Sequence, residues 1–199
     1  MFKWNKPFKM VMEIKKDYIN SVGELDTYDF NTWVEKLDNE KYNNFLEPLQ
    51  VNQYKNFLLI RYGLAEMQRG MWEDKESIYR QCRSVVIDLE NDELALTPFK
   101  KFFNINEVEE NNVDNLVEKI KQAKVFEISN KLDGSMISIR YYKGDYLIST
   151  SMTLNEEISW RLQDAKEMFY KDKSIMEFVK DYSDYTFVFE YISFRDEIG

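Results

Sequence analysis

Residues 129–142, SNKLDGSMISIRYY, hold the side chains best suited to chemistry. Lys131 stands two residues before Asp133 and three before Gly134, between two segments whose composition is typical of β-strands. A neutral lysine amine is a nucleophile, and nearby cations or partial burial lower its pKa and free its lone pair. Its natural target is an electrophile that carries negative charge, such as a phosphate. The alternative is an ordinary β-turn with a solvated lysine, in which Asp133 only forms the turn.

The chain contains no histidine. This excludes histidine-based triads, histidine proton shuttles and histidine metal ligands. Any chemistry would have to use a lysine nucleophile or carboxylates that hold a hard cation. The single cysteine, Cys82, excludes an internal disulfide and fits a reducing, cytoplasmic location. We expect Cys82 to be a small buried side chain.

The chain has 199 residues, of which 44% are hydrophobic, and a formal net charge of −9. This length indicates one domain, or one domain with an appendage, with enough apolar residues for a sizeable core. The negative charge argues against indiscriminate binding to nucleic acid or membranes, although a local basic groove remains possible. No apolar run approaches the roughly 18 residues of a membrane span, so we expect no membrane segment.

Residue patterns predict a mostly helical N-terminal region, 1–79, and a second region, 80–199, in which strands and helices alternate. The strands expected from β-prone runs and turn signals are 52–61, two within 82–99 about a turn at Asn91-Asp92, 124–130, 136–142 with 146–151 as a hairpin, and 185–193. The helices expected are one with Val113, Leu116, Val117 and Ile120 on one face, and a region at 155–182 broken near Lys173. Antiparallel strands with inserted helices predict an α+β fold.

Four segments, taken in order, resemble the Lys-x-Asp-Gly nucleotidyltransferases, which include ATP-dependent ligases and mRNA capping enzymes, and in particular RNA ligases of the bacteriophage T4 RNA ligase 1 type. The segment KLDG contains Lys131, and CRSVVIDLE resembles the arginine-containing strand upstream of the family's nucleophile. PFKKFFNINE resembles the family's Pro-x-x-Lys-Phe-Phe-Asn segment, and FVFEYISFRDEIG resembles its later glutamate-containing strand. The resemblance covers roughly residues 80–199.

This resemblance implies a nucleotidyltransferase domain with an ATP-grasp-like, antiparallel-rich sheet. It implies that Lys131 attacks the α-phosphorus of ATP and forms a lysine–AMP intermediate. AMP would then pass to an RNA 5′-phosphate, which a 3′-hydroxyl attacks in the joining step. ATP and Mg²⁺ are the implied cofactors, and RNA ends, possibly those of tRNA, are the implied partners. Phosphoryl transfer needs in-line positioning and cations, which is compatible with the absence of histidine.

The resemblance also assigns roles to residues around the nucleophile. The implied nucleotide-binding residues are Arg83, Lys101, Asn130, Asp133, Gly134 and Glu190. Glu190 stands between Phe189 and Tyr191, so on a strand it faces away from both, where it would contact metal or ribose. Lys100 and Lys101 are adjacent, so either of them is a candidate for the lysine that faces inward. The family register selects Lys101. Phe102 and Phe103 are expected in the core.

The sequence departs from the family pattern in two places. Ser151 stands where the family often has a lysine, which puts one phosphate or RNA contact in doubt. The family continues past the position of Gly199 with another metal-binding carboxylate and a lysine pair, so we expect a fragment or a truncated form that lacks a C-terminal portion of the ligase. A non-catalytic nucleotide- or RNA-binding module is therefore the alternative function. A DNA ligase or capping enzyme is a second alternative, disfavoured by KFFN and by Ser135 and Met136 after Asp-Gly, where those enzymes have arginine.

Overall fold

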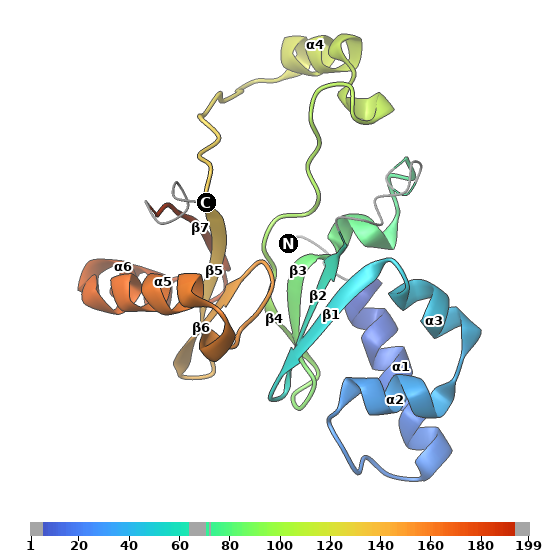
Figure 1. Ribbon diagram of the computed structural model, residues 1–199. Helices are drawn as coiled ribbons and strands as arrows, with labels where there is room; N and C mark the ends of the chain where they lie inside the picture. Colours follow the sequence, from blue (N-terminus) through green and yellow to red (C-terminus); the bar gives the residue numbers. More distant parts are fainter. Residues whose placement is uncertain (1–5, 64–70, 72, 194–199) are drawn as a thin grey trace.

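The computed structural model describes residues 6–63, 71 and 73–193. These residues form two small antiparallel sheets flanked by helices (Figure 1). The first sheet has the order β1-β2-β3-β4, with strands Leu49–Tyr54, Phe57–Tyr62, Arg83–Asp88 and Glu93–Leu96. The second has the order β6-β5-β7, with strands Asp145–Thr150, Ser135–Tyr142 and Phe187–Tyr191. The α+β class with antiparallel strands is therefore confirmed. Within the described ranges, no helix is both long and apolar enough to cross a membrane.

Three N-terminal helices cover one face of the first sheet (Figure 1). They are α1 (Lys6–Val22), α2 (Phe30–Leu37) and α3 (Glu40–Leu46). Asp29 begins α2 by accepting a hydrogen bond from the backbone N–H of Asn31, as an N-cap residue does. The fully buried ring of Trp33 packs in this layer, together with Phe30 and Tyr18. Cys82 lies in the same core with no exposed surface, as the sequence predicts, and burial raises the pKa of its thiol.

The prediction of one strand at 52–61 is wrong, because these residues form a hairpin of β1 and β2. Lys55 has a φ of +55° and makes the tight turn between the two strands. This turn contains neither glycine nor proline, and Lys55 stands within a β-prone run, so the sequence pattern did not indicate a turn. β2 then pairs with β3, so the first sheet joins strands from both sides of the division expected at residues 79 and 80.

Other predicted elements are confirmed. β3 and β4 flank the turn at Asn91-Asp92, and a short 3₁₀ helix, η1 (Ile78–Gln81), precedes β3. β5 and β6 form the predicted hairpin, where Lys143 and Gly144 both have positive φ, as the favoured two-residue turns require. Two more short 3₁₀ helices are η2 (Glu109–Asn111) and η3 (Glu156–Ile158). The helical region breaks at Asp172, which ends α5 (Trp160–Lys171) and caps α6 (Lys173–Asp181).

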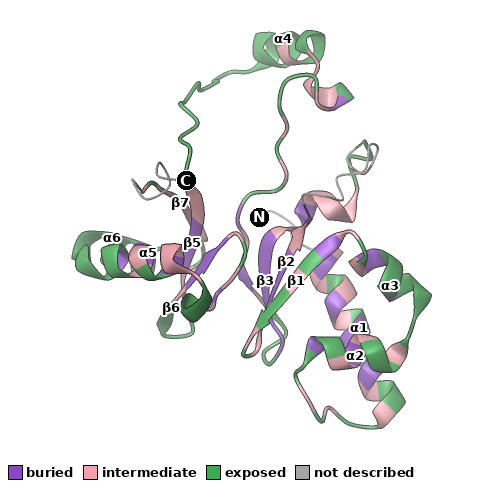
Figure 2. Cartoon of the chain, in the orientation of Figure 1, coloured by how far each residue is buried: buried purple, intermediate pink, exposed green. Residues whose placement is uncertain are grey.

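The helix α4 (Val113–Gln122) is also confirmed, but it lies away from both sheets at the end of two extended segments (Figure 1). Its apolar face, with Val113, Val117 and Ile120, is exposed (Figure 2). The strand predicted at 124–130 is wrong, since these residues form no strand and all are exposed. β-propensity expresses packing against neighbouring strands, and this apolar run has no partner strand in the described part of the chain.

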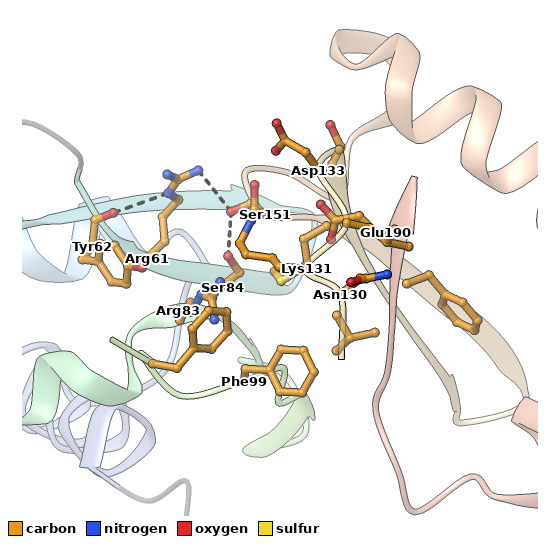
Figure 3. Close-up of a pocket in the computed structure, with 17 residues that line it drawn as sticks. Arg61, Tyr62, Arg83, Ser84, Phe99, Asn130, Lys131, Asp133, Ser151 and Glu190 are labelled. Atoms are coloured by element: carbon orange, nitrogen blue, oxygen red, sulfur yellow. Dashed lines mark hydrogen bonds between the residues drawn. The ribbon is translucent and has the colours of Figure 1, made fainter. Parts of the chain in front are cut away.

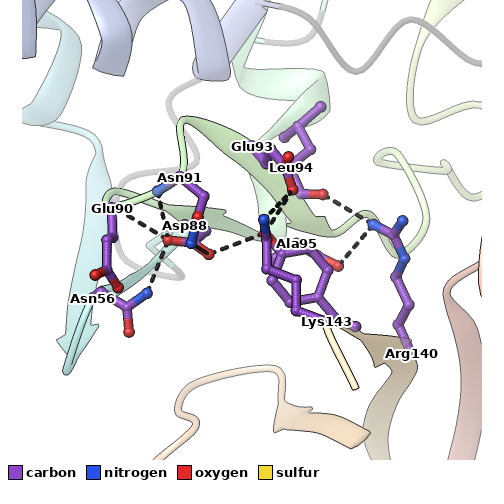
Figure 4. A network of polar contacts seen from close by, with 10 residues as sticks. Asn56, Asp88, Glu90, Asn91, Glu93, Leu94, Ala95, Arg140 and Lys143 are labelled. Carbon is purple, nitrogen blue, oxygen red and sulfur yellow. Dashed lines mark hydrogen bonds and ion pairs between the residues drawn. The ribbon is translucent and has the colours of Figure 1, made fainter. Parts of the chain in front are cut away.

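Polar contacts join the two sheets where β4 faces β5 (Figure 4). The Arg140 guanidinium of β5 donates to the carbonyl oxygens of Leu94 at 3.0 Å and Ala95 at 3.2 Å, and also to that of Ser183 at 2.8 Å. A guanidinium suits this role because its donors form a fixed fork. The hydrogen bonds hold one sheet at a defined position against the other.

The hydroxyl of Tyr142, also on β5, lies 3.0 Å from a carboxylate oxygen of Asp88 and 2.9 Å from one of Glu93. It has one proton and donates to one of them at a time. Burial first, then these two carboxylates, raise the pKa of Tyr142. Burial by itself would raise the pKa of Asp88, but hydrogen bonds from Asn91, Asn56 and Tyr142 outweigh it and hold that pKa below its ordinary value. The junction is thus a well-bonded network, buried at Asp88 and Tyr142, that joins the two sheets.

Candidate active site

A cavity of about 550 Å³ opens between the two sheets. Figure 3 shows Arg61, Arg83 and Ser84 of the first sheet on one side and Glu190 with the Asn130–Asp133 segment on the other. Six of the seven sequence-predicted site residues line it: Arg83, Asn130, Lys131, Asp133, Gly134 and Glu190. The fold thus brings together residues that are separated by more than one hundred positions in the chain.

A β-bulge shapes the first-sheet side of the cavity. In the pairing of β2 with β3, Ile60 is opposite Val85 and Arg61 is opposite Arg83, so Ser84 is an extra residue. Ser84 is 2% exposed and has a φ of +62°, in the left-handed region that residues other than glycine rarely adopt. Its hydroxyl donates to the carbonyl oxygen of Ser151 at 2.8 Å and so anchors the bulge to the second sheet. Bulges commonly redirect side chains beside functional sites.

The bulge leaves two arginines directly opposite each other on neighbouring strands, and both line the cavity. Like charges in directly opposed positions destabilise a sheet. Arg61 is half-buried, and burial lowers the pKa of its guanidinium. Its Nη1 atom lies 3.4 Å from the carbonyl oxygen of Ser151, which is a neutral partner. An anion bound beside Arg61 and Arg83 would therefore relieve this repulsion.

Arg83 carries a buried donor without a partner. Its Nη1 atom is buried and makes no hydrogen bond with any described residue. Its guanidinium lies 4.0 Å from the centre of the Phe102 ring, which holds it in place from one side. A buried unsatisfied donor is costly and requires an explanation. A phosphate oxygen would be a suitable acceptor for this donor.

Lys131 reaches the cavity from an extended segment rather than from the end of a strand. The prediction that Lys131 follows a strand is wrong, because residues 124–130 have no partner strand in the described part of the chain. The next strand, β5, begins only at Ser135. Lys131 is exposed and makes no ion pair or hydrogen bond with any described residue. Its amine is therefore available to a ligand in the cavity.

Gly134 occupies a position where the backbone of β7 leaves no room for a side chain. It does not have a positive φ, so an unusual backbone conformation does not explain it. A Cβ atom at this position would overlap the carbonyl oxygen of Tyr191 and lie 3.3 Å from Cγ of Glu190. Gly134 therefore lets the start of β5 approach β7 closely, which places the Lys131 segment beside Glu190.

Two carboxylates line the cavity, Asp133 and Glu190. Glu190 is exposed while Phe189 and Tyr191 pack against the helices on the other face of β7, which confirms the predicted alternation. Within the described ranges, no group of three or more acidic or cysteine side chains is placed to hold a metal ion by itself. Magnesium in nucleotide sites is commonly held by one or two carboxylates together with substrate phosphates, so these two residues suit that arrangement.

Lys101 lies outside this cavity. Its side chain is 10% exposed and forms an ion pair with Glu107 at 2.7 Å. It lines a second, neighbouring cavity together with Lys100. Phe102, by contrast, belongs to both cavities and is 51% exposed. The prediction of a core position for Phe102 is therefore wrong, because its ring packs against Arg83 and Phe99 at the surface of the first cavity.

The contributors to the cavity that were missed from the sequence include Arg61, Ser84, Phe99 and Phe102. Arg61 had one usable signal, a positive charge at the end of the apolar run FLLIR. Ser84 had none, since the bulge depends on the strand register. Ser151 lies in the cavity where the family has a lysine, and here it contributes a carbonyl oxygen that holds Ser84 and Arg61.

Among its described lining residues, the cavity thus combines two arginines on neighbouring strands, an available lysine and two carboxylates, a set of side chains that suits an anionic ligand. A comparison with known protein families agrees with this class. The RNA ligase family that contains T4 RNA ligase 1 matches residues 81–198, more than half of the chain. The chain therefore belongs to this RNA ligase family. The comparison with curated proteins gives no match.

Proposed function

We propose that this chain carries the nucleotidyltransferase domain of an ATP-dependent RNA ligase and that Lys131 is its nucleophile. Membership of the RNA ligase family supports RNA as the class of substrate. The observation that carries the finer assignment is the convergence of Lys131, the unsatisfied Arg83 and the Arg61–Arg83 pair on one cavity. We also infer that the two sheets are the nucleotide-binding core that the sequence resemblance implies.

In the proposed first step, the Lys131 amine attacks the α-phosphorus of ATP. A nitrogen–phosphorus bond forms, the bond to the bridging oxygen of pyrophosphate breaks, and the neutral amine loses one of its two protons to solvent. Arg61 and Arg83 hold phosphate oxygens and stabilise the negative charge that develops on them. Asp133 and Glu190 would hold Mg²⁺, which when bound supplies further neutralisation of the phosphates.

In the following steps, the chain's residues position the RNA ends. The AMP group passes from Lys131 to an RNA 5′-phosphate, and a 3′-hydroxyl then displaces AMP. Asn130 lies beside Lys131 at the cavity and is proposed to contact the nucleotide base. Lys101 is proposed to contact phosphate from the neighbouring cavity. The partner tRNA, any additional C-terminal portion and a cytoplasmic location remain predictions of the sequence.

A second candidate function is a binding module that holds nucleotide or RNA without turnover. It is favoured by the exposed position of Lys131 and by Ser151 in place of a lysine. The two functions differ in the covalent step alone. A binding module would keep its ligand affinity and form no adduct, whereas a ligase domain forms a lysine–AMP bond.

The experiment is intact-protein mass spectrometry after incubation with ATP and Mg²⁺. Wild-type protein is expected to gain one AMP, and Lys131→Ala is expected to gain none. Lys124→Ala is the matched control, because Lys124 is an exposed lysine in the same extended segment. Adduct on the control but not on Lys131→Ala supports the ligase. A folded wild-type chain that binds ATP without an adduct supports the binding module.

A further inference from the structure

A second cavity, of about 450 Å³, adjoins the first and shares Phe102 with it. Four cationic side chains line it: Lys75, Arg80, Lys100 and Lys101. Glu110 is the single acidic residue among the described lining residues. On a chain with a formal net charge of −9, this concentration of positive charge is a local exception. We refer to this cavity as the cationic groove.

Among the described residues, the cations of the cationic groove outnumber the carboxylates that pair with them. Arg80 pairs with Glu110 at 2.7 Å, and Lys75 lies 3.8 Å from the same carboxylate. Lys101 pairs with Glu107, and Lys100 forms no ion pair in the part of the chain that the structure describes. Two described carboxylates thus lie near four cations. Lys75, whose side chain is 70% exposed, and the exposed Lys100 can extend toward a ligand, while the other two are fixed.

The exposed ring of Phe102 lines both cavities, and the exposed ring of Phe99 lies beside it in the first. Phe99 and Phe102 are 52% and 51% exposed, and their ring centres lie 6.2 Å apart. Arg83 lies against Phe102 on the side of the first cavity. Aromatic rings beside a positively charged groove are the usual arrangement for single-stranded nucleic acid, because bases stack on the rings while cations follow the backbone. A free polyphosphate would use the cations and leave the exposed parts of both rings in solvent.

We propose that the cationic groove holds the sugar–phosphate backbone of a single-stranded RNA end, with bases stacked on Phe99 and Phe102. This arrangement leads the strand's 5′-phosphate from the groove into the first cavity, where Lys131 lies. The inference rests on the proposed function for the reaction that the strand enters. The binding surface itself follows from the charges and rings of the groove. Pyrophosphate or the outer phosphates of ATP are the other source of phosphate for these lysines.

The test is fluorescence anisotropy with a single-stranded, 5′-phosphorylated RNA of about 12 nucleotides, within the usual range of site sizes. Lys75→Gln/Lys100→Gln is expected to bind it about tenfold more weakly, with a salt dependence reduced by about 1.4 in log–log slope for two lost phosphate contacts. Phe99→Leu is expected to weaken binding without changing this slope, since it removes stacking alone. The matched control is Lys16→Gln/Lys171→Gln, which removes two exposed lysines, on α1 and α5, that do not line the groove.

Each outcome separates this inference from the proposed function. Equal RNA affinity for wild type and Lys75→Gln/Lys100→Gln, or equal losses in that variant and its control, would overturn the groove. A higher ATP requirement for adenylation with unchanged RNA affinity would assign the lysines to the nucleotide instead, and would also overturn it. Failure of wild type to form an AMP adduct, with the RNA affinity still dependent on Lys75 and Lys100, would reject the ligase step and leave the groove intact.

Discussion

Replacing Arg83 by methionine should separate the function of this residue from its effect on stability. The arginine has a buried Nη1 donor with no described partner, which costs about 1–3 kcal/mol of stability. Methionine removes this cost and retains apolar packing, but it loses the cation–π contact with Phe102, worth about 0.5–2 kcal/mol. We expect the free energy of unfolding of Arg83→Met to stay within about 1 kcal/mol of wild type or to rise by up to about 2 kcal/mol.

The stabilisation by ATP should fall in Arg83→Met, although the free energy of unfolding without ATP stays the same or rises. A ligand at one hundred times its Kd stabilises a protein by about 2.7 kcal/mol, which corresponds to roughly 5–10 °C in Tm for a chain of this size. Wild type should show this increase with ATP and Mg²⁺, and Arg83→Met should show little of it. Thermal unfolding followed by circular dichroism, with and without ATP, measures both quantities.

Arg80→Met is the matched control for this experiment. Arg80 is similarly enclosed but pairs with Glu110 at 2.7 Å, so its loss leaves a partly buried carboxylate without that partner. We expect this control to lose about 1–3 kcal/mol of stability and to keep its response to ATP. The reasoning would be refuted if Arg83→Met lost more than about 2 kcal/mol and still responded to ATP as wild type does.

Three further predictions follow from the same contacts. Gly134→Ala should lose about 1–3 kcal/mol in urea unfolding, because its Cβ overlaps the Tyr191 carbonyl, and an unchanged midpoint would contradict that close approach. Asp88 has a lowered pKa in the fold, so its contribution to stability is complete above its unfolded pKa of about 4 and is lost as the pH falls through the lower folded value. Asp88→Asn should therefore flatten the acid side of the stability–pH curve, and an unaltered curve would contradict this. Cys82 should resist iodoacetamide in the folded protein, since it has no exposed surface and burial raises its thiol pKa, whereas rapid alkylation would show that the core opens.

The elements that the sequence predicted well are those whose signals are local. The turns at Asn91-Asp92 and Lys143-Gly144 have residues that adopt positive φ, and Asp172 both ends one helix and caps the next. The segment 124–130 shows the opposite case. Its β-prone residues have no neighbouring strand in the described fold, and strand formation depends on that neighbour.

The residues of the candidate site also divide into those with a local sequence signal and those whose position depends on the tertiary fold. Lys131, Asp133 and Glu190 were found because their motifs are short and contiguous in sequence. Arg61 and Ser84 were missed because their positions depend on a bulge in the pairing of β2 with β3, which changes the register by one residue. Phe102 was misplaced because its apolar character fits a core and a stacking surface equally well, and only the tertiary fold distinguishes them.

The most direct test of the central claim is to locate the modified residue. Wild-type protein is incubated with ATP and Mg²⁺, digested, and analysed by tandem mass spectrometry for peptides that carry AMP. The account predicts AMP on the Nζ atom of Lys131 and its release when 5′-phosphorylated RNA is added. AMP on Lys101 or another lysine instead, or a folded chain that binds ATP and carries no AMP on any peptide, would contradict it.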